Sequence, residues 1–165
     1  INNGEKIIDI GCGYGAVARS IALAKNKSLI IGIDINEENI NQAKNFKNPK
    51  NLCFYLEDAN TNKSKIKADV IVLSNVLEHI ENRIIFLSNL RNFTEAYKIL
   101  IRVPLFERDW QIPLRKELDI DYFSDNDHKI EHTLDEFKKE LALAKIKIEK
   151  ISTKWGEIWA SCYYE

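Results

Sequence analysis

Three glycines, preceded by an aspartate, lie within one short segment of the chain, and their types and spacing could form a ligand-binding loop. The segment reads DIGCGYG over residues 9–15, between an expected strand at 6–10 and an expected helix at 16–24. Glycine at such a junction lets the backbone turn sharply and approach a ligand without a Cβ in the way. The N-terminus of the following helix adds free N–H groups and a partial positive potential. We therefore expect a loop that binds the carboxylate of a ligand.

The spacing of the glycines distinguishes between cofactor classes. A dinucleotide-binding loop has the pattern GxGxxG. Here Gly11, Gly13 and Gly15 form GxGxG, Ala16 follows, and Asp9 stands two residues before the first glycine. This pattern disfavours a nicotinamide dehydrogenase. A plain strand–helix turn is the structural alternative, and three glycines within five residues behind an aspartate argue against it.

Two further acids follow expected strands. Asp34 ends the strand expected at 29–33, and Asp58 comes after the strand expected at 52–56. A carboxylate at the first position can accept hydrogen bonds from both hydroxyls of a ribose, and one at the second can accept from an adenine amine. Considered alone, Asp34 could be simply an aspartate at a helix start, and Asp58 could be a solvated turn residue. Because parallel strands end at one edge of a sheet, the acids together indicate a ligand site there.

The remaining pattern predicts an α/β protein with a Rossmann-like, doubly wound, mostly parallel seven-stranded sheet and a C-terminal antiparallel hairpin. Asn36 is expected to cap the second helix, and Thr133 with Glu136 forms a capping box before another. The expected strands and helices alternate as far as Pro104. They comprise strands at 6–10, 29–33, 52–56, 69–73, 98–103, 147–151 and 157–164, and helices at 16–24, from 36, at 83–93 and from 133.

The segments quoted above, together with SNVLEHI at residues 74–80, resemble the class I S-adenosylmethionine-dependent methyltransferases. They look most like members that act on small molecules and lipid or quinone-type substrates. The resemblance implies S-adenosylmethionine as the cofactor and S-adenosylhomocysteine as its product. The cofactor-binding residues that it implies are Asp9, Gly11, Cys12, Gly13, Gly15, Asp34, Ile35, Asp58, Ala59, Ser74, Asn75 and Val76.

Within this resemblance, the glycine loop would hold the methionine moiety and Asp34 the ribose. Ile35 would pack on the adenine, while Asp58 and the Ala59 N–H would bond to it. The backbone at 74–75 would border the methionine amino group, and residues 76–79 would face the methyl group. The sequence departs from the family pattern in two ways. The helix that usually precedes the first strand is missing or truncated. SNVLEHI also differs from the Asn-Pro-Pro-aromatic motif of enzymes that methylate DNA bases or protein glutamine amides. Those two acceptors are therefore disfavoured.

Residues for the acceptor are harder to assign. His79 is the candidate general base, although it could instead be a helix-start histidine packed beside the cofactor. The insert at 104–130 is expected to be irregular and to form an acceptor pocket or lid, with Arg108 and Trp110 as candidate contacts. A partner-binding or purely structural insert is the alternative.

Two more histidines, His128 and His132, follow in an acidic stretch. Their spacing fits neither a zincin helix nor a calcium loop, so we predict no metal and interpret the stretch as a solvated loop. A contact between one of these histidines and the substrate stays open.

Composition limits the remaining possibilities. The 165 residues suit one domain over 1–165, and the formal net charge of −1 gives no field to attract nucleic acid or an anionic membrane. No apolar run approaches the roughly 20 residues of a membrane span. Three separated cysteines without a CxxC pair fit a reducing cytoplasm.

The leading hypothesis is therefore a cytoplasmic methyltransferase for a small acceptor. The alternative is a non-catalytic cofactor-binding domain with a regulatory or scaffolding role. Nothing in the sequence identifies the acceptor atom or the oligomeric state.

Overall fold

A single mixed sheet forms the centre of the computed structural model, which describes residues 1–61 and 66–165. Within those residues seven strands lie in the order β3-β2-β1-β4-β5-β7-β6. Neighbours from β3 to β5 are parallel, while β7 pairs antiparallel with both β5 and β6. The predicted sheet with its C-terminal hairpin is confirmed. The strands are β1 (Lys6–Ile10), β2 (Leu29–Asp34), β3 (Leu52–Leu56), β4 (Val70–Ser74), β5 (Lys98–Pro104), β6 (Ile146–Lys154) and β7 (Glu157–Tyr164).

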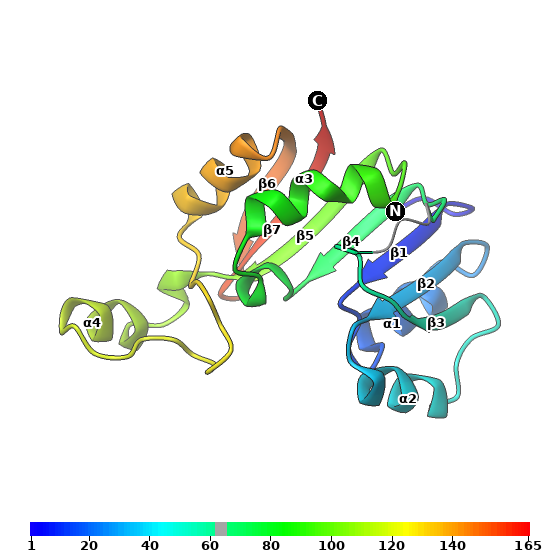
Figure 1. The fold of residues 1–165 in the computed structure, drawn as a ribbon, viewed down its shortest axis with the longest axis horizontal. Coiled ribbons are helices and arrows are strands. Elements are labelled where there is room, and N and C mark those ends of the chain that lie inside the picture. The colour runs from blue at the N-terminus through cyan, green and yellow to red at the C-terminus, as the bar shows by residue number, and fades with distance from the viewer. Residues whose placement is uncertain (62–65) are drawn as a thin grey trace.

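Helices cover both faces of this sheet (Figure 1). One hydrophobic cluster joins α1 and α2 to β1 through Ile7, and the other joins α3 and α5 to β1 through Ile8, because successive strand residues point to opposite faces. No helix in the described residues is long and apolar enough to cross a membrane. The helices are α1 (Ala16–Ala24), α2 (Glu37–Asn45), η1 (Leu77–His79), α3 (Arg83–Phe93), η2 (Phe106–Arg108), α4 (Gln111–Glu117) and α5 (Leu134–Leu143).

Local capping fixes the start of two of these helices. The Asn36 side chain accepts hydrogen bonds from the backbone N–H groups of Glu38 and Asn39 at the start of α2. Thr133 and Glu136 form the reciprocal capping box at the start of α5. Both caps were predicted from sequence, because capping depends on residues only two or three positions apart.

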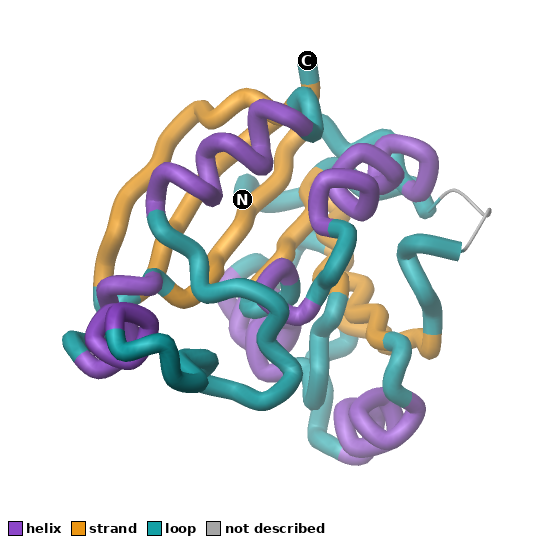
Figure 2. Tube along the Cα trace, turned by 60° about the vertical axis from the view of Figure 1, so that its left-hand side comes forward, coloured by secondary structure: helices purple, strands orange, loops and turns teal. Residues whose placement is uncertain are grey.

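The segment after β5 differs from the prediction of an irregular insert. It contains η2 and the helix α4, which projects from the rest of the molecule (Figure 1). Pro113 is the third residue of α4, where a missing N–H breaks no intrahelical bond. The Asp109 carboxylate supplies a cap by accepting from the N–H groups of Gln111 and Ile112. After α4 the chain returns toward the body as a long loop before α5 begins (Figure 2).

Close packing beneath the glycine loop explains two of its glycines. At Gly11 a Cβ would lie 2.7 Å from Val76 Cγ2, and at Gly15 it would overlap the Phe54 ring. A Cβ at Gly32 on β2 would also lie 2.5 Å from Phe54 Cδ1. The Phe54 ring on β3 therefore occupies the volume that side chains at positions 15 and 32 would take. The loop lies directly on the sheet, with its backbone open to the strand ends.

Candidate active site

A cavity of about 420 Å³ lies at the carboxyl ends of β1, β2 and β4. The glycine loop forms one side, and the turns after β2, β3 and β4 form the others. Strands β1 and β4 are neighbours, as are β1 and β2, so residues distant in sequence converge here. Of the residues singled out by sequence, the lining includes Gly11, Gly13, Asp34, Ile35, Asp58, Ala59, Asn75, Val76 and His79.

Asp34 connects the glycine loop to the start of α2. It is 8% exposed. Its Oδ2 accepts from the Gly13 backbone N–H at 2.8 Å, and its Oδ1 accepts from the Asn36 N–H at 2.8 Å. The Asn39 side-chain amide also donates to Oδ1, at 3.5 Å. A carboxylate offers about four lone-pair positions, so these three donors still leave capacity for a ligand. Asp34 both holds the loop and borders the cavity.

Beyond Asp34, the wall of the cavity combines an apolar side chain with a polar turn. Ile35 is 75% exposed although it lines the cavity, so it offers an uncovered apolar surface. The Asp58 carboxylate accepts from the Asn60 N–H at 2.8 Å and from the Thr61 hydroxyl at 3.1 Å. These local bonds fix the orientation of Asp58 at the cavity. A flat ring with a polar edge matches such a wall.

Four predicted cofactor contacts lie outside this lining: Asp9, Cys12, Gly15 and Ser74. Asp9 is 1% exposed, and its Oδ2 has no hydrogen-bond partner among the described residues. Burial, together with the nearby Asp34 charge, raises the pKa of Asp9 to about 7, against the opposing effects of the Ala18 N–H and Arg102. Burial also raises the pKa of the Cys12 thiol, so that group is no thiolate nucleophile.

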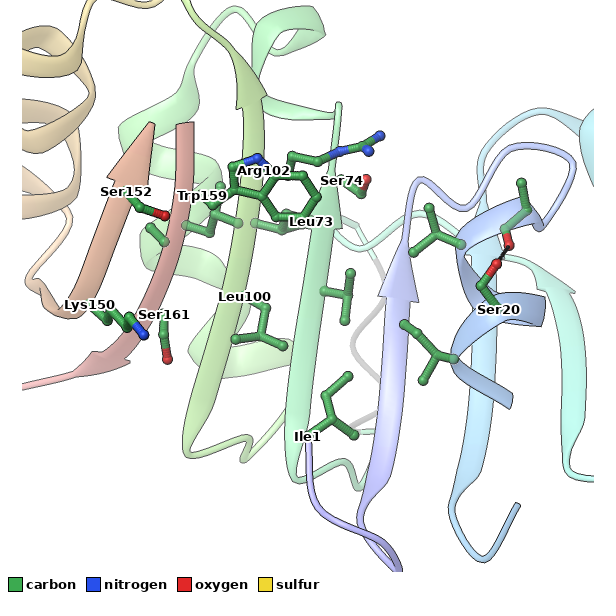
Figure 3. Close-up of a pocket in the computed structure, with 16 residues that line it drawn as sticks. Ile1, Ser20, Leu73, Ser74, Leu100, Arg102, Lys150, Ser152, Trp159 and Ser161 are labelled. Atoms are coloured by element: carbon green, nitrogen blue, oxygen red, sulfur yellow. Dashed lines mark hydrogen bonds between the residues drawn. The ribbon is translucent and has the colours of Figure 1, made fainter. Parts of the chain in front are cut away.

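A second hollow, of about 680 Å³, lies on the α1 face of β4, β5 and β7. Leu100, Trp159 and Ser74 lie on the strands that border it (Figure 3). Its lining in the described part of the chain includes no carboxylate. Since a ribose and an amino group need acceptors, the carboxylate-lined cavity is the better candidate for ligand chemistry.

His79 ends η1, directly after β4, and lines the candidate cavity. Its Nδ1 lies 3.1 Å from Asp127 Oδ2, although the two groups do not align as a hydrogen bond. Asp127 is the residue of the insert that reaches the cavity lining. The insert is also tied to η1 by the Lys129 N–H, which donates to the Glu78 carbonyl at 2.6 Å. The loop after α4 thus borders the site, whereas α4 projects away.

The other predicted acceptor contacts lie outside the cavity lining. Arg108 donates from Nη1 to Glu131 Oε2 at 2.7 Å, while Trp110 is 71% exposed. His132 is fully buried, and its Nε2 lies 3.1 Å from Glu140 Oε2. Hence Arg108 and His132 make structural contacts within the chain.

His128 lies close to His79 and is held by a buried carboxylate. The two imidazole rings meet edge to face, with centroids 4.9 Å apart. His128 Nδ1 lies 2.9 Å from Glu131 Oε1. Burial of Glu131 opposes its ionisation, but hydrogen bonds from Arg108, the Ser124 N–H and His128 outweigh burial and lower its pKa to about 2. A fixed anion therefore orients His128.

Sequence reasoning missed several residues at or near the cavity. Asn39 and Phe86 line it from α2 and α3, and Asp127 does so from the insert. Glu78 is buried beside His79, and burial raises the pKa of its carboxyl to about 7. Asn39 lies five residues after Asp34, at the start of a capped helix, which was a usable local signal. No local sequence signal identified Asp127, because its position at the cavity depends on the path of the loop.

Comparison with known proteins agrees with this geometry. A family model described as "Methyltransferase domain" matches residues 1–159. The chain belongs to this methyltransferase family. The family predicted from the glycine loop and the strand-end acids is therefore confirmed, and it accounts for the cavity at the carboxyl edge of the sheet.

Individual relatives of this methyltransferase domain are distant. The ubiquinone biosynthesis O-methyltransferase of Coxiella burnetii (strain Dugway 5J108-111) is 31% identical over 80 residues, or 47% of this chain, and the match spans 33% of that relative. Magnesium protoporphyrin IX methyltransferase (ChlM) from Synechocystis PCC 6803, solved with bound SAH, has a TM-score of 0.73 at 18% identity, covering 99% of this chain and 75% of that one. The small RNA methyltransferase HEN1 has a TM-score of 0.78 at 19% identity, covering 99% of this chain and 23% of that one. The two structures establish the fold.

The raised pKa of Asp9 predicts how the unfolding free energy of the chain depends on pH. The folded-state pKa of about 7 lies above the roughly 3.9 of an unfolded aspartate. The folded chain therefore keeps a proton that the unfolded chain releases, and this contribution to stability is lost as pH rises from about 4 to about 7. The unfolding free energy of Asp9→Asn minus that of wild type should therefore increase by about 2–3 kcal/mol as pH rises from about 5 to about 8. Urea titration of ligand-free protein measures this difference. Asp119→Asn, at an exposed carboxylate, is the control, and parallel pH profiles for wild type and Asp9→Asn would contradict the assignment.

Proposed function

We propose that this chain is an S-adenosylmethionine-dependent methyltransferase that acts on a small-molecule acceptor. The observation that carries the proposal is the single cavity shared by the glycine loop, the strand-end carboxylates Asp34 and Asp58, and His79. A ligand with an amino acid end, a ribose and an adenine needs an anion-binding turn, a hydroxyl acceptor and an amine acceptor. These groups follow one another along the carboxyl edge of the sheet.

The adenosyl half of the ligand fits the side of the cavity formed after β2 and β3. Asp34 is proposed to accept hydrogen bonds from the ribose hydroxyls through the lone pairs that Gly13 and Asn36 leave free. Ile35 offers the apolar surface for the adenine ring. Asp58 accepts from the exocyclic amine, and the Ala59 N–H donates to the ring.

The methionine half fits the side formed by β1 and β4. Gly13 borders open space, since nothing lies within 4 Å of a Cβ built there. The backbone at Gly13 can therefore approach the ligand closely. Asn75 and Val76 line the cavity next to Gly11, where Val76 packs against the loop. Asp9, under the loop, supplies negative charge for the ammonium group. The roles of Cys12, Gly15 and Ser74 are then to shape the loop and the strand end.

Methyl transfer from this site needs orientation more than acid–base power. The cofactor supplies an activated methyl group on a sulfonium centre. The chain contributes by holding the acceptor in line with the sulfur–methyl bond, an effect of about 7–11 kcal/mol in well-oriented reactions. His79 lies after β4, next to the methyl-facing wall at Val76, and is proposed to take the acceptor proton. The Asp127 carboxylate lies beside it, with Oδ2 3.1 Å from His79 Nδ1.

Asp34→Asn tests the cofactor site. The variant can keep an acceptor for the Gly13 N–H, loses the one for the Asn36 N–H, and removes the charge that is proposed to bind the ribose. We expect the dissociation constant for S-adenosylhomocysteine to rise about 10- to 150-fold, as for loss of about 1.5–3 kcal/mol in hydrogen bonds to a charged group. Isothermal calorimetry measures the change, with Glu37→Gln on the exposed face of α2 as the matched control. An affinity within about twofold of wild type would refute the ribose contact.

His79→Ala tests catalysis separately from binding. Removing the proposed base should lower methyl transfer by about 10²- to 10⁴-fold. The adenosyl contacts are elsewhere in the cavity, so S-adenosylhomocysteine affinity should stay close to that of wild type. Turnover is measured against a panel of small hydroxyl, amine and thiol acceptors. Unchanged turnover would remove His79 from the reaction, and a wild-type protein that binds the cofactor without methylating any acceptor would favour a non-catalytic domain.

A further inference from the structure

Three side chains of types that can bind a metal lie together at and behind His79, which lines the candidate cavity. Glu78, His79 and His128 each offer one ligand atom, and these atoms all lie within 4.8 Å of one another. Glu78 and His79 are adjacent on η1, whereas His128 comes from the returning loop of the insert. We propose that these three side chains bind a divalent first-row transition-metal cation.

The burial of Glu78 is the first reason. Its side chain is 1% exposed, and in the described part of the chain neither carboxylate oxygen has a hydrogen-bond partner. Buried polar groups in folded proteins are nearly always paired, because an unpaired one costs free energy. A cation between Glu78 and the two imidazoles supplies the missing partner for the carboxylate.

The surroundings of His128 are the second reason. Glu131 accepts from His128 at Nδ1, and Glu131 is itself fixed by Arg108 at 2.7 Å and by the Ser124 N–H at 2.8 Å. An imidazole that donates from one nitrogen to a carboxylate presents the other nitrogen as an unprotonated ligand. Carboxylate–histidine pairs of this kind orient the ligands of many metal centres. Arg108 and Glu131 are thus positioning residues for His128.

The geometry and ligand types indicate the class of cation. Metal–nitrogen and metal–oxygen bonds of about 2.0–2.2 Å place neighbouring ligands about 3–4 Å apart, so closing the site needs side-chain shifts on the order of 1 Å. Two imidazoles with one carboxylate suit zinc, manganese, iron or cobalt better than calcium or magnesium, which prefer all-oxygen sites. Of the three ligands, His79 lines the cavity, so a cation bound to it would lie beside the space expected for the acceptor. On the proposed function, the bound cation would hold an oxygen of the acceptor. His79 cannot bind the cation and take the acceptor proton at once, so it would act as the base only in the metal-free chain.

Cobalt(II) is the probe for the test, because its visible absorption reports its ligands. Chelator-treated, dialysed full chain is titrated with Co²⁺ and followed by absorption and calorimetry. Wild type should bind one equivalent of Co²⁺, and added Zn²⁺ should displace the bound Co²⁺. Glu78→Gln and His128→Gln should each raise the Co²⁺ dissociation constant on the order of 100-fold. Glu81→Gln, an exposed acid three residues further along, is the matched control and should bind like wild type.

The outcomes separate this proposal from the proposed function. Circular dichroism establishes that each variant is folded, and calorimetry with S-adenosylhomocysteine is repeated on each without metal. If wild type binds S-adenosylhomocysteine but shows no Co²⁺ spectrum, or if Glu78→Gln binds Co²⁺ as tightly as wild type, the metal site is refuted and the cofactor site stands. If Co²⁺ binds as expected while S-adenosylhomocysteine does not bind, the metal site stands and the proposed function is refuted.

Discussion

The hydrogen bond from the Gly13 N–H to Asp34 Oδ2 is the contact on which the shape of the candidate site depends. It joins the loop after β1 to the end of β2, and the other Asp34 oxygen joins that point to the start of α2. Beneath it, the Phe54 ring occupies the space that side chains at Gly15 and Gly32 would need. The loop is therefore held from the side by a carboxylate and supported from below by a ring. A cavity remains where the strands end.

This arrangement explains why the site has two kinds of acid. Asp34 and Asp58 accept several hydrogen bonds at the cavity, so they are kept in place as acceptors. Asp9 and Glu78 are buried with unpaired oxygens and raised pKa values, so their charge is costly in the ligand-free chain. Buried charges in proteins are usually paired with an opposite charge or coordinate a metal. In our proposals, the ammonium end of the cofactor serves Asp9 and a metal cation serves Glu78.

The sequence revealed those parts of the site that depend on local chemistry and on parallel-sheet geometry. Asp34 and Asp58 could be placed together because parallel strands end at one edge, and Asn36 could be assigned as a cap from its neighbours. The cluster of Glu78 with His128 could not be found this way, since fifty residues of unknown path separate them. Sequence reasoning paired His128 with His132 instead and predicted no metal. The structure turns His132 inward to Glu140 and places His128 beside His79.

The insert shows the same limit. The segment 104–130 was expected to be irregular, yet it contains α4, and Pro113 falls in the first turn of that helix, where proline is tolerated. Arg108 and Trp110 were expected at the acceptor, but Arg108 acts at a distance by holding Glu131, which holds His128. The aromatic and charged composition of the segment was visible in the sequence, whereas the direction in which each side chain points depends on packing between distant elements.

A crystal structure of the chain with S-adenosylhomocysteine would test the account most directly. The ligand should lie in the cavity at the ends of β1, β2 and β4, with its ribose hydroxyls about 2.7 Å from the Asp34 oxygens. The adenine should lie against Ile35, and the sulfur should lie on the side of His79. A ligand bound instead in the hollow beside Leu100 and Trp159, or a cavity ligand that makes no contact with Asp34, would contradict it.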